Sequence, residues 1–214
     1  FASDLAGDQS SMISRGDCMY GKGPASKMKF IACCVLAASL LLGASAAAAV
    51  PEGETLLERA RNAYDVFRPY TYLHISQGEK EEAYQYQSEY VPIRDVFGGR
   101  VERIRWNGKT KTAEIVNGGK TLVFNFSDEE PESTDTKIVL PKEWIRLSDG
   151  RTEIHAALLS YLFDREMSMQ PDVDEEREAW RERLGFLGIK STSALPGVRD
   201  DYLYVYLSFE EPTS

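Results

Sequence analysis

Histidine is the first residue type to consider for chemistry, because the chain after residue 49 holds only His74 and His155. Two histidines so far apart in the sequence make a weak metal site, and no acidic residue follows His155 by one helical turn. The G-x-S-x-G, H-E-x-x-H and P-loop patterns do not occur. The sequence therefore predicts no catalytic residue, no metal site and no cofactor.

Acidic side chains gather in two runs, Asp128–Glu132 and Asp172–Glu178. Both runs lack the central glycine of a calcium-binding loop, so they indicate solvated surface. A pair of carboxylates could also perform glycoside hydrolysis, but nothing in the sequence distinguishes one pair from the rest. Of the functions considered, an enzyme is the least favoured.

The segment at residues 28–49 is typical of a secretory signal peptide. Lys27 and Lys29 supply a basic start, and Phe30–Leu42 is an uninterrupted apolar run. Small residues follow up to Ala49, where signal peptidase requires small side chains. We expect cleavage after Ala49 and a periplasmic location for the mature protein.

This segment has two alternative interpretations. Phe30–Val50 is just long enough to be a transmembrane anchor, although its Ala-rich second half is weakly apolar. A lipoprotein anchor is rejected, because Cys33 and Cys34 lie near the start of the apolar run instead of after it. Residues 1–27 are a polar upstream segment outside any domain.

The remaining residues, 50–214, suffice for one domain that must fold without disulfides, because all three cysteines lie before residue 50. The whole chain has 25 basic and 34 acidic residues, and four basic and three acidic ones precede residue 50. The 21 basic and 31 acidic residues that remain give a net charge of −10. Such a charge repels phosphate backbones, so nucleic acid is not an expected partner.

The period of the apolar pattern changes along the domain from about 3.6 to 2 and back, which predicts an α+β fold. No internal repeat is seen in the sequence. Glycine and proline mark turns at Gly98-Gly99, Asn107-Gly108 and Asn117-Gly119. The expected helices run from Thr55 or Glu54 to about Arg68, from Asp149 or Thr152 to Phe163, and over Asp172–Leu184. The expected strands are Tyr70–Gln77, a strand through Tyr84, Tyr86 and Tyr90, Val101–Trp106, Lys111–Val116, Lys120–Phe126, Lys137–Leu140, Lys190–Leu195 and Tyr202–Phe209.

The strand Tyr202–Phe209 is strongly apolar and ends five residues before the last one. A strand of this composition needs partners on both sides or becomes an adhesive edge. We therefore expect it to lie at a sheet edge or to leave apolar surface open, because we expect the sequence to be truncated at its C-terminus and further strands to be missing.

The run Arg103-Ile104-Arg105-Trp106, followed by Ile115–Phe126 with its Asn-Gly-Gly-Lys-Thr-Leu turn, resembles the core of the periplasmic outer-membrane lipoprotein carrier (LolA) superfamily. The resemblance covers about Leu56–Phe163 and includes the order of export signal, helix, meander and Leu-rich helix. Two departures are the charged hairpin Asn107–Lys111 and the scarcity of C-terminal strands.

This resemblance implies an unclosed antiparallel half-barrel, with helices packed on its concave face over an apolar cavity for acyl chains. The alternation of the strands independently puts the strand residues of the candidate site on one face, where they could line a cavity or form an ordinary core. The candidate ligand-binding residues are Ile104, Trp106, Leu122, Phe124 and Phe126 on the strands, and Leu158 and Tyr161 on the lid helix.

Two hypotheses follow. The first is a periplasmic carrier or binding protein for lipoprotein acyl chains or another lipid. The second is a sensor or protein-interaction module on the same scaffold without a ligand cavity, with a membrane-associated protein as its partner.

Overall fold

A computed structural model describes residues 53–64, 68–129, 131–168 and 174–211. All of them belong to one compact unit, Ala46–Ser214, and the predicted signal peptide lies outside the described residues. The fold is α+β, with three mostly antiparallel sheets that do not close into a barrel and a few helices. Within the described ranges, no helix has the length and hydrophobicity needed to cross a membrane.

The first sheet has the strand order β10-β11-β1-β2. Its strands are β1 (Tyr70–Gln77), β2 (Lys80–Tyr86), β10 (Ile189–Pro196) and β11 (Tyr202–Phe209). The predicted bounds of β1 and β11 are confirmed, but the expected edge position of β11 is wrong. β11 lies between β10 and β1 and pairs in parallel with β1 over their full length. Local sequence could not reveal this pairing, because β1 lies far away in the chain.

The second sheet has the order β3-β9-β8, with β3 (Tyr90–Pro92), β8 (Ile145–Ser148) and β9 (Arg151–His155). Here the predicted start of the second helix is wrong. Asp149 and Gly150 adopt positive φ angles of 49° and 73° and form a hairpin turn, so the residues after them pair back onto β8. Helix α3 (Ala156–Phe163) begins only after β9. The single strand expected through Tyr84, Tyr86 and Tyr90 is likewise split between β2 and β3.

The third sheet has the order β4-β5-β6-β7, with β4 (Arg103–Asn107), β5 (Thr112–Asn117), β6 (Lys120–Asn125) and β7 (Lys137–Val139). Gly118 and Gly119 have φ angles of 52° and 73°, as the predicted tight turn requires. β7 pairs in parallel with β6. The expectation of one antiparallel sheet is therefore wrong, since the described strands form three sheets with two parallel pairs.

Capping side chains determine where two of the helices begin. In α1 (Leu56–Ala63), Thr55 and Glu58 form a reciprocal capping box. This helix ends earlier than the predicted Arg68. Asp174 accepts from the backbone at the start of α5 (Glu175–Leu184). The shorter elements are α2 (Ile93–Phe97), α4 (Arg165–Ser168), η1 (Lys142–Trp144) and η2 (Gly185–Leu187).

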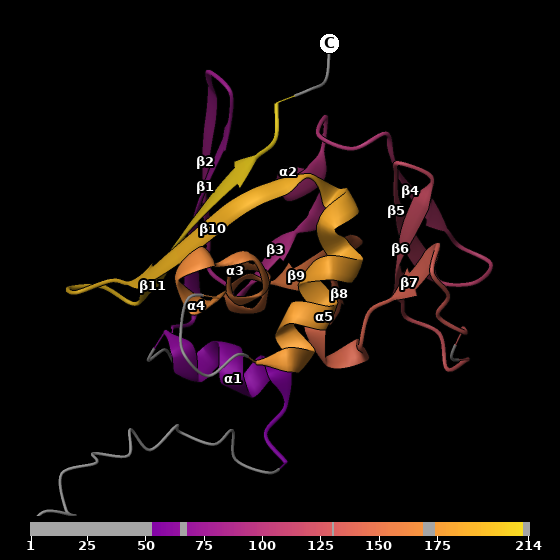
Figure 1. The fold of residues 1–214 in the computed structure, drawn as a ribbon, viewed down its shortest axis with the longest axis horizontal. Helices are drawn as coiled ribbons and strands as arrows, with labels where there is room; N and C mark the ends of the chain where they lie inside the picture. The colour runs from indigo at the N-terminus through magenta and orange to yellow at the C-terminus, as the bar shows by residue number, and fades with distance from the viewer. Residues whose placement is uncertain (1–52, 65–67, 130, 169–173, 212–214) are drawn as a thin grey trace, which may run out of the picture. The chain divides into compact units, whose positions relative to one another are not determined.

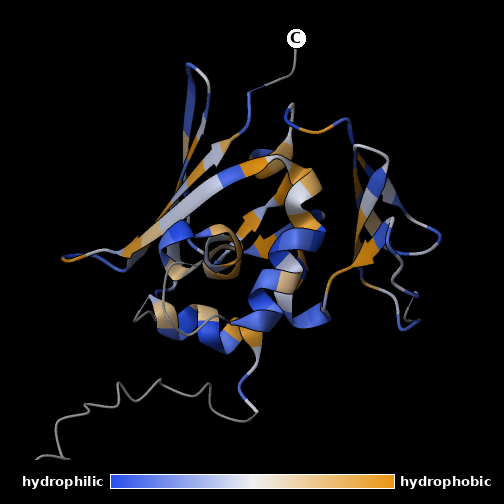
Figure 2. Ribbon diagram, viewed as in Figure 1, coloured by the Kyte–Doolittle hydropathy of each residue, from blue (hydrophilic) through white to orange (hydrophobic). Residues whose placement is uncertain are grey.

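Helix α3 is the centre of the core, since all eight of its residues are buried. It packs against β10 and β11 and against α1 and α5, which surround it in Figure 1. The inner side chains of the first sheet, such as Leu73 and Val205, are fully buried. Figure 2 shows the contrast with α5, which is largely hydrophilic.

Two strand–helix units occupy equivalent positions in the second sheet. β3 leads into α2 and β9 leads into α3, and the two strands pair antiparallel about Val91 and Ile154. Pro92 and His155 occupy the N-cap positions of the two helices. The sequence hides this relationship, because the units share little beyond a β-branched residue at the central pair.

Candidate binding cleft

Cross-strand register places Ile104 and Trp106 on the inner face of the third sheet. Ile104 pairs with Ile115, which pairs with Leu122. Trp106 pairs with Ala113, which pairs with Phe124. Directly paired residues share one face of a sheet, so both rows lie on the same side, as the alternation predicted.

Burial falls along both rows towards β4, which is the edge of this sheet. Ile115, Leu122 and Phe124 have no exposed surface, whereas Ile104 is half-buried and Trp106 is 46% exposed. The inner face is thus packed over β5 and β6 and open beneath β4. The open part forms a cleft.

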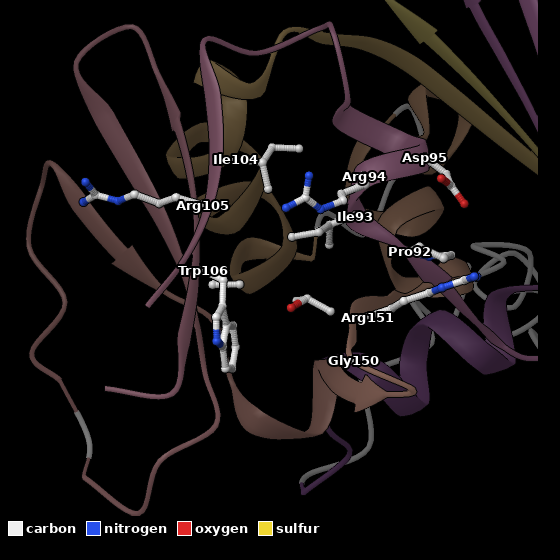
Figure 3. Close-up of a pocket in the computed structure, with 11 residues that line it drawn as sticks. Pro92, Ile93, Arg94, Asp95, Ile104, Arg105, Trp106, Gly150 and Arg151 are labelled. Carbon is white, nitrogen blue, oxygen red and sulfur yellow. The ribbon is translucent and has the colours of Figure 1, made fainter. Parts of the chain in front are cut away.

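The cleft has a volume of about 430 Å³ and lies between β4, the β3–α2 segment and the β8–β9 turn. Figure 3 shows Ile104 and Trp106 extending from β4 towards the space in front of Ile93, whereas Arg105 points to the other side of the strand. The remaining lining residues are Pro92, Arg94, Asp95, Ala113, Gly150, Arg151 and Thr152. An aromatic ring, two isoleucines and several polar groups therefore face one space.

The charged side chains around the cleft differ in whether they already have a hydrogen-bond or ion-pair partner. Asp95 accepts a 2.7 Å hydrogen bond from Tyr86, and burial together with this bond raises the pKa of Tyr86. Arg105 pairs with Glu114 on β5. Arg94 is exposed, makes no side-chain ion pair with any residue in the described ranges, and extends from α2 towards Ile104 in Figure 3. Its guanidinium can therefore pair with an anionic group of a ligand.

Arg100 holds α2 in place beside the cleft. Its side chain is 6% exposed, and its Nη1 donates to the backbone carbonyls of Asp95, Val96 and Gly98 at 3.3 Å each. Its Nη2 pairs with Glu82 on β2 at 2.7 Å. These carbonyls end the helix without intrahelical partners, so the guanidinium caps α2 and ties it to the first sheet.

The other candidate residues do not line the cleft. Leu122, Phe124 and Leu158 are fully buried in the core, and Phe126 lies against Trp106 with ring centroids 6.1 Å apart. The Tyr161 hydroxyl donates to Asp174 at 2.9 Å, and burial with this bond raises the pKa of Tyr161 to about 12. The structure thus brings Ile104 and Trp106 together in the cleft and places the others in or beside the core.

The two histidines have different surroundings. His155 is 2% exposed, and its Nδ1 accepts from the backbone N–H of Leu158 as the cap of α3. Its Nε2 lies 3.2 Å from Glu89, which also pairs with Arg61 at 2.7 Å. His74 lies half-buried on the outer face of the first sheet. The residues described include no group of three or more His, Cys, Asp or Glu arranged to hold a metal ion.

Sequence reasoning missed Ile93 and Arg94. They lie on α2, whose five residues are too few to show a helical period. The available signal was Pro92, which is followed by an isoleucine and charged residues, and Pro commonly precedes or opens a helix.

No protein-family model, no curated protein and no solved structure matches this chain.

Proposed function

We propose that this protein is an exported binding protein and that its ligand is a small amphiphile bound in the cleft beneath β4. The observation that supports this proposal is the pairing of an exposed Trp106 and a half-buried Ile104 with the unengaged cation of Arg94. Trp106 and Ile104 offer apolar contact, and Arg94 offers a partner for an anion.

The size of the cleft limits the ligand. Small-molecule sites have volumes of roughly 300–1,000 Å³, so about 430 Å³ lies near the lower end. One acyl chain of moderate length with a carboxylate or phosphate head suits this space better than a lipid anchor with several chains. Binding is proposed in preference to catalysis, because His155 already caps a helix and bonds to Glu89.

A LolA-like scaffold remains a hypothesis within this proposal. It is supported by the antiparallel β4–β5–β6 meander on the motif residues and by sheets that stay unclosed. The parallel pairs β1–β11 and β6–β7 depart from it. A carrier of the LolA type would hold its ligand between a curved sheet and the helices, where Leu122, Phe124 and Leu158 are fully buried.

That burial favours a second candidate function, a periplasmic protein-interaction module. In this function the interior is filled by side chains, and the cleft receives an apolar side chain of a protein partner beside an acidic group. The two functions predict different ligands for the same residues, so one titration can separate them.

The test is a fluorescence titration of the purified protein with a brominated fatty acid. Bromine quenches a nearby indole, and Trp106 is the half-exposed tryptophan beside the cleft. Trp144 is 2% exposed, and Trp180 packs against Trp144 and does not line the cleft. We expect saturable quenching that is lost in Trp106→Phe and weakened about tenfold in Arg94→Gln, which corresponds to one charge-assisted contact. Arg103→Gln, on the opposite face of β4, is the matched control and should bind like the unmodified protein.

The head group provides a further control. The methyl ester of the same brominated chain should bind the unmodified protein about as weakly as the acid binds Arg94→Gln. No saturable quenching by either molecule would contradict the amphiphile proposal and leave the interaction module as the candidate function. Quenching that is unchanged in Trp106→Phe would place the ligand elsewhere.

Export is tested separately by N-terminal sequencing of protein recovered from the periplasm. The mature chain should begin near Val50. A chain that retains Phe30–Leu42 would indicate a membrane anchor instead.

A further inference from the structure

The parallel pairing of β1 with β11 builds an aromatic ladder on the outer face of the first sheet. Side chains of paired residues point to the same side, and every second pair over this stretch carries two rings. Their ring centroids are 5.4, 5.2 and 5.7 Å apart, with interplanar angles of 38–53°. The ladder consists of the pairs Tyr70–Tyr202, Tyr72–Tyr204 and His74–Tyr206.

The ladder lies on the side of the sheet opposite the core. The alternate residues of both strands, such as Leu73 and Val205, are fully buried, and β11 packs against α3, whereas Tyr206 is 40% exposed. The flanking strands add Ala83 and Gln85 on β2 and Ser193 and Leu195 on β10 in the same rows, and Leu195, which pairs with Tyr204, is 62% exposed. The rings therefore form an accessible platform that Leu195 extends on the β10 side.

The platform offers hydroxyl groups and few free charges. At one end, Asp200 accepts a 2.7 Å hydrogen bond from the hydroxyl of Tyr204, and Asp201 lies 3.7 Å from Arg68. At the other end, Glu81 lies 3.8 Å from His74. Because Asp200 and Asp201 already face a donor and a cation, little free charge remains at that end of the platform, and the surface matches a neutral partner. The acidic net charge of the chain, −9, disfavours an anionic one.

We propose that this ladder is a binding platform for a neutral polysaccharide. The C–H faces of sugar rings pack on aromatic rings, and tyrosine supplies rigid contact area together with a hydroxyl that can hydrogen-bond. The first and third rows of the ladder are four residues apart, or about 13 Å along the strands, which suits several consecutive sugar rings of an extended chain. This platform belongs to the first sheet and shares no residue with the cleft beneath β4.

The experiment is affinity electrophoresis of the purified full chain in native gels that contain hydroxyethylcellulose, a soluble mixed-linkage β-glucan or glycol chitin. We expect at least one of these gels to retard the protein. The double variant Tyr72→Ala/Tyr206→Ala should weaken that retardation by roughly tenfold or more, as the loss of two stacking contacts predicts. Tyr206→Ala alone keeps the test valid if the double variant unfolds, because this ring is the most exposed of the ladder.

Trp106→Ala is the control for the other site and should be retarded like the unmodified protein. A gel containing alginate, an anionic polysaccharide, should cause no retardation. Absence of retardation in every neutral gel, or equal retardation of the tyrosine variants, would overturn the proposal. Binding to polylysine with the same dependence on tyrosine would also overturn it, because the partner would then be a cationic peptide.

Discussion

The Nε2 of His155 lies 3.2 Å from the carboxylate of Glu89, so the N-cap of α3 is tied to the residue before β3. The Nδ1 of the same ring accepts from the N–H of Leu158. Both contacts fit a neutral imidazole with its proton on Nε2, because Nδ1 must keep a lone pair to accept. Burial lowers the pKa of His155 against the opposing effect of Glu89, which favours the same neutral form.

We predict that stability falls as the pH drops below neutral. His155 titrates near pH 6.5 in the unfolded chain and lower in the folded one, so below that pH the unfolded state takes up a proton first. The melting temperature should therefore decrease from about pH 7 to about pH 5. In His155→Asn, where asparagine can still cap the helix, the melting temperature should change less over that range. If the melting temperature depends equally on pH in the two proteins, His155 is not the cause of the loss of stability.

Protonation of Glu89 should cause a second loss of stability at more acidic pH. Its hydrogen bond with His155, and its pairing with Arg61, lower the pKa of Glu89 to about 2 from the usual 4.5. The unfolded chain therefore takes up this proton first as the pH falls, and the stabilisation disappears between about pH 4.5 and 2. Glu89→Gln should be less stable at neutral pH and should show a weaker dependence within that acid window. Urea denaturation at a series of pH values measures both.

The contrast between Leu122 and Trp106 predicts unequal costs for two truncations on one sheet face. Leu122→Ala should lower the free energy of unfolding by about 2–5 kcal/mol, because it leaves a hole in a fully buried site. Trp106→Ala should cost about 2 kcal/mol, no more than the smallest cost expected for Leu122→Ala, since nearly half of that large side chain is already exposed. Chemical denaturation of both variants checks this, and a larger cost for Trp106→Ala than for Leu122→Ala would mean that the cleft is closed in solution.

Arg177 attaches α5 to the end of α3. Its side chain is 1% exposed, and its Nε donates to the carbonyl of Tyr161 at 2.6 Å while its Nη2 donates to that of Asp164. We expect Arg177→Met to cost about 3 kcal/mol, because it leaves buried carbonyls without donors. Amide exchange should accelerate in α5 first. The same change at Arg181, which is 41% exposed, should cost under about 1 kcal/mol.

Local signals predicted the parts of the fold that local chemistry controls. The alternation of apolar residues gave the bounds of β1 and β11, and Gly118-Gly119 gave a turn that needs two positive φ angles. Neither signal contains the parallel pairing of β1 with β11, which depends on packing between distant segments. The edge position expected for β11 failed for that reason.

The β8–β9 hairpin shows a conflict between two signals. Ile154, Ala157 and Leu158 fit a helical stripe, and that stripe led to a helix starting too early. Asp149-Gly150 is a strong hairpin signal and prevails, because the strand that follows it pairs with both β3 and β8. The same limit applies to the cleft. Alternation placed Ile104 and Trp106 on one face, but Arg94 reaches them only through the tertiary fold.

Arg100 positions the cleft without lining it. Its planar guanidinium donates to the last carbonyls of α2 and to Glu82 at the same time. A lysine keeps the charge but cannot reproduce this fork. We therefore expect Arg100→Lys to lower the free energy of unfolding by about 1–3 kcal/mol, as expected for lost hydrogen bonds to a buried charged group.

Because α2 carries Ile93 and Arg94, the effect of Arg100→Lys should extend to ligand binding. The brominated fatty acid should bind this variant more weakly, although Arg100 does not line the cleft. Arg103→Lys is the matched control, since Arg103 is exposed on the outer face of β4, and it should change neither stability nor binding. If Arg100→Lys lowers stability and leaves binding unchanged, α2 is held by other contacts. If it weakens binding while Arg103→Lys does not, the geometry of the cleft depends on a capped α2.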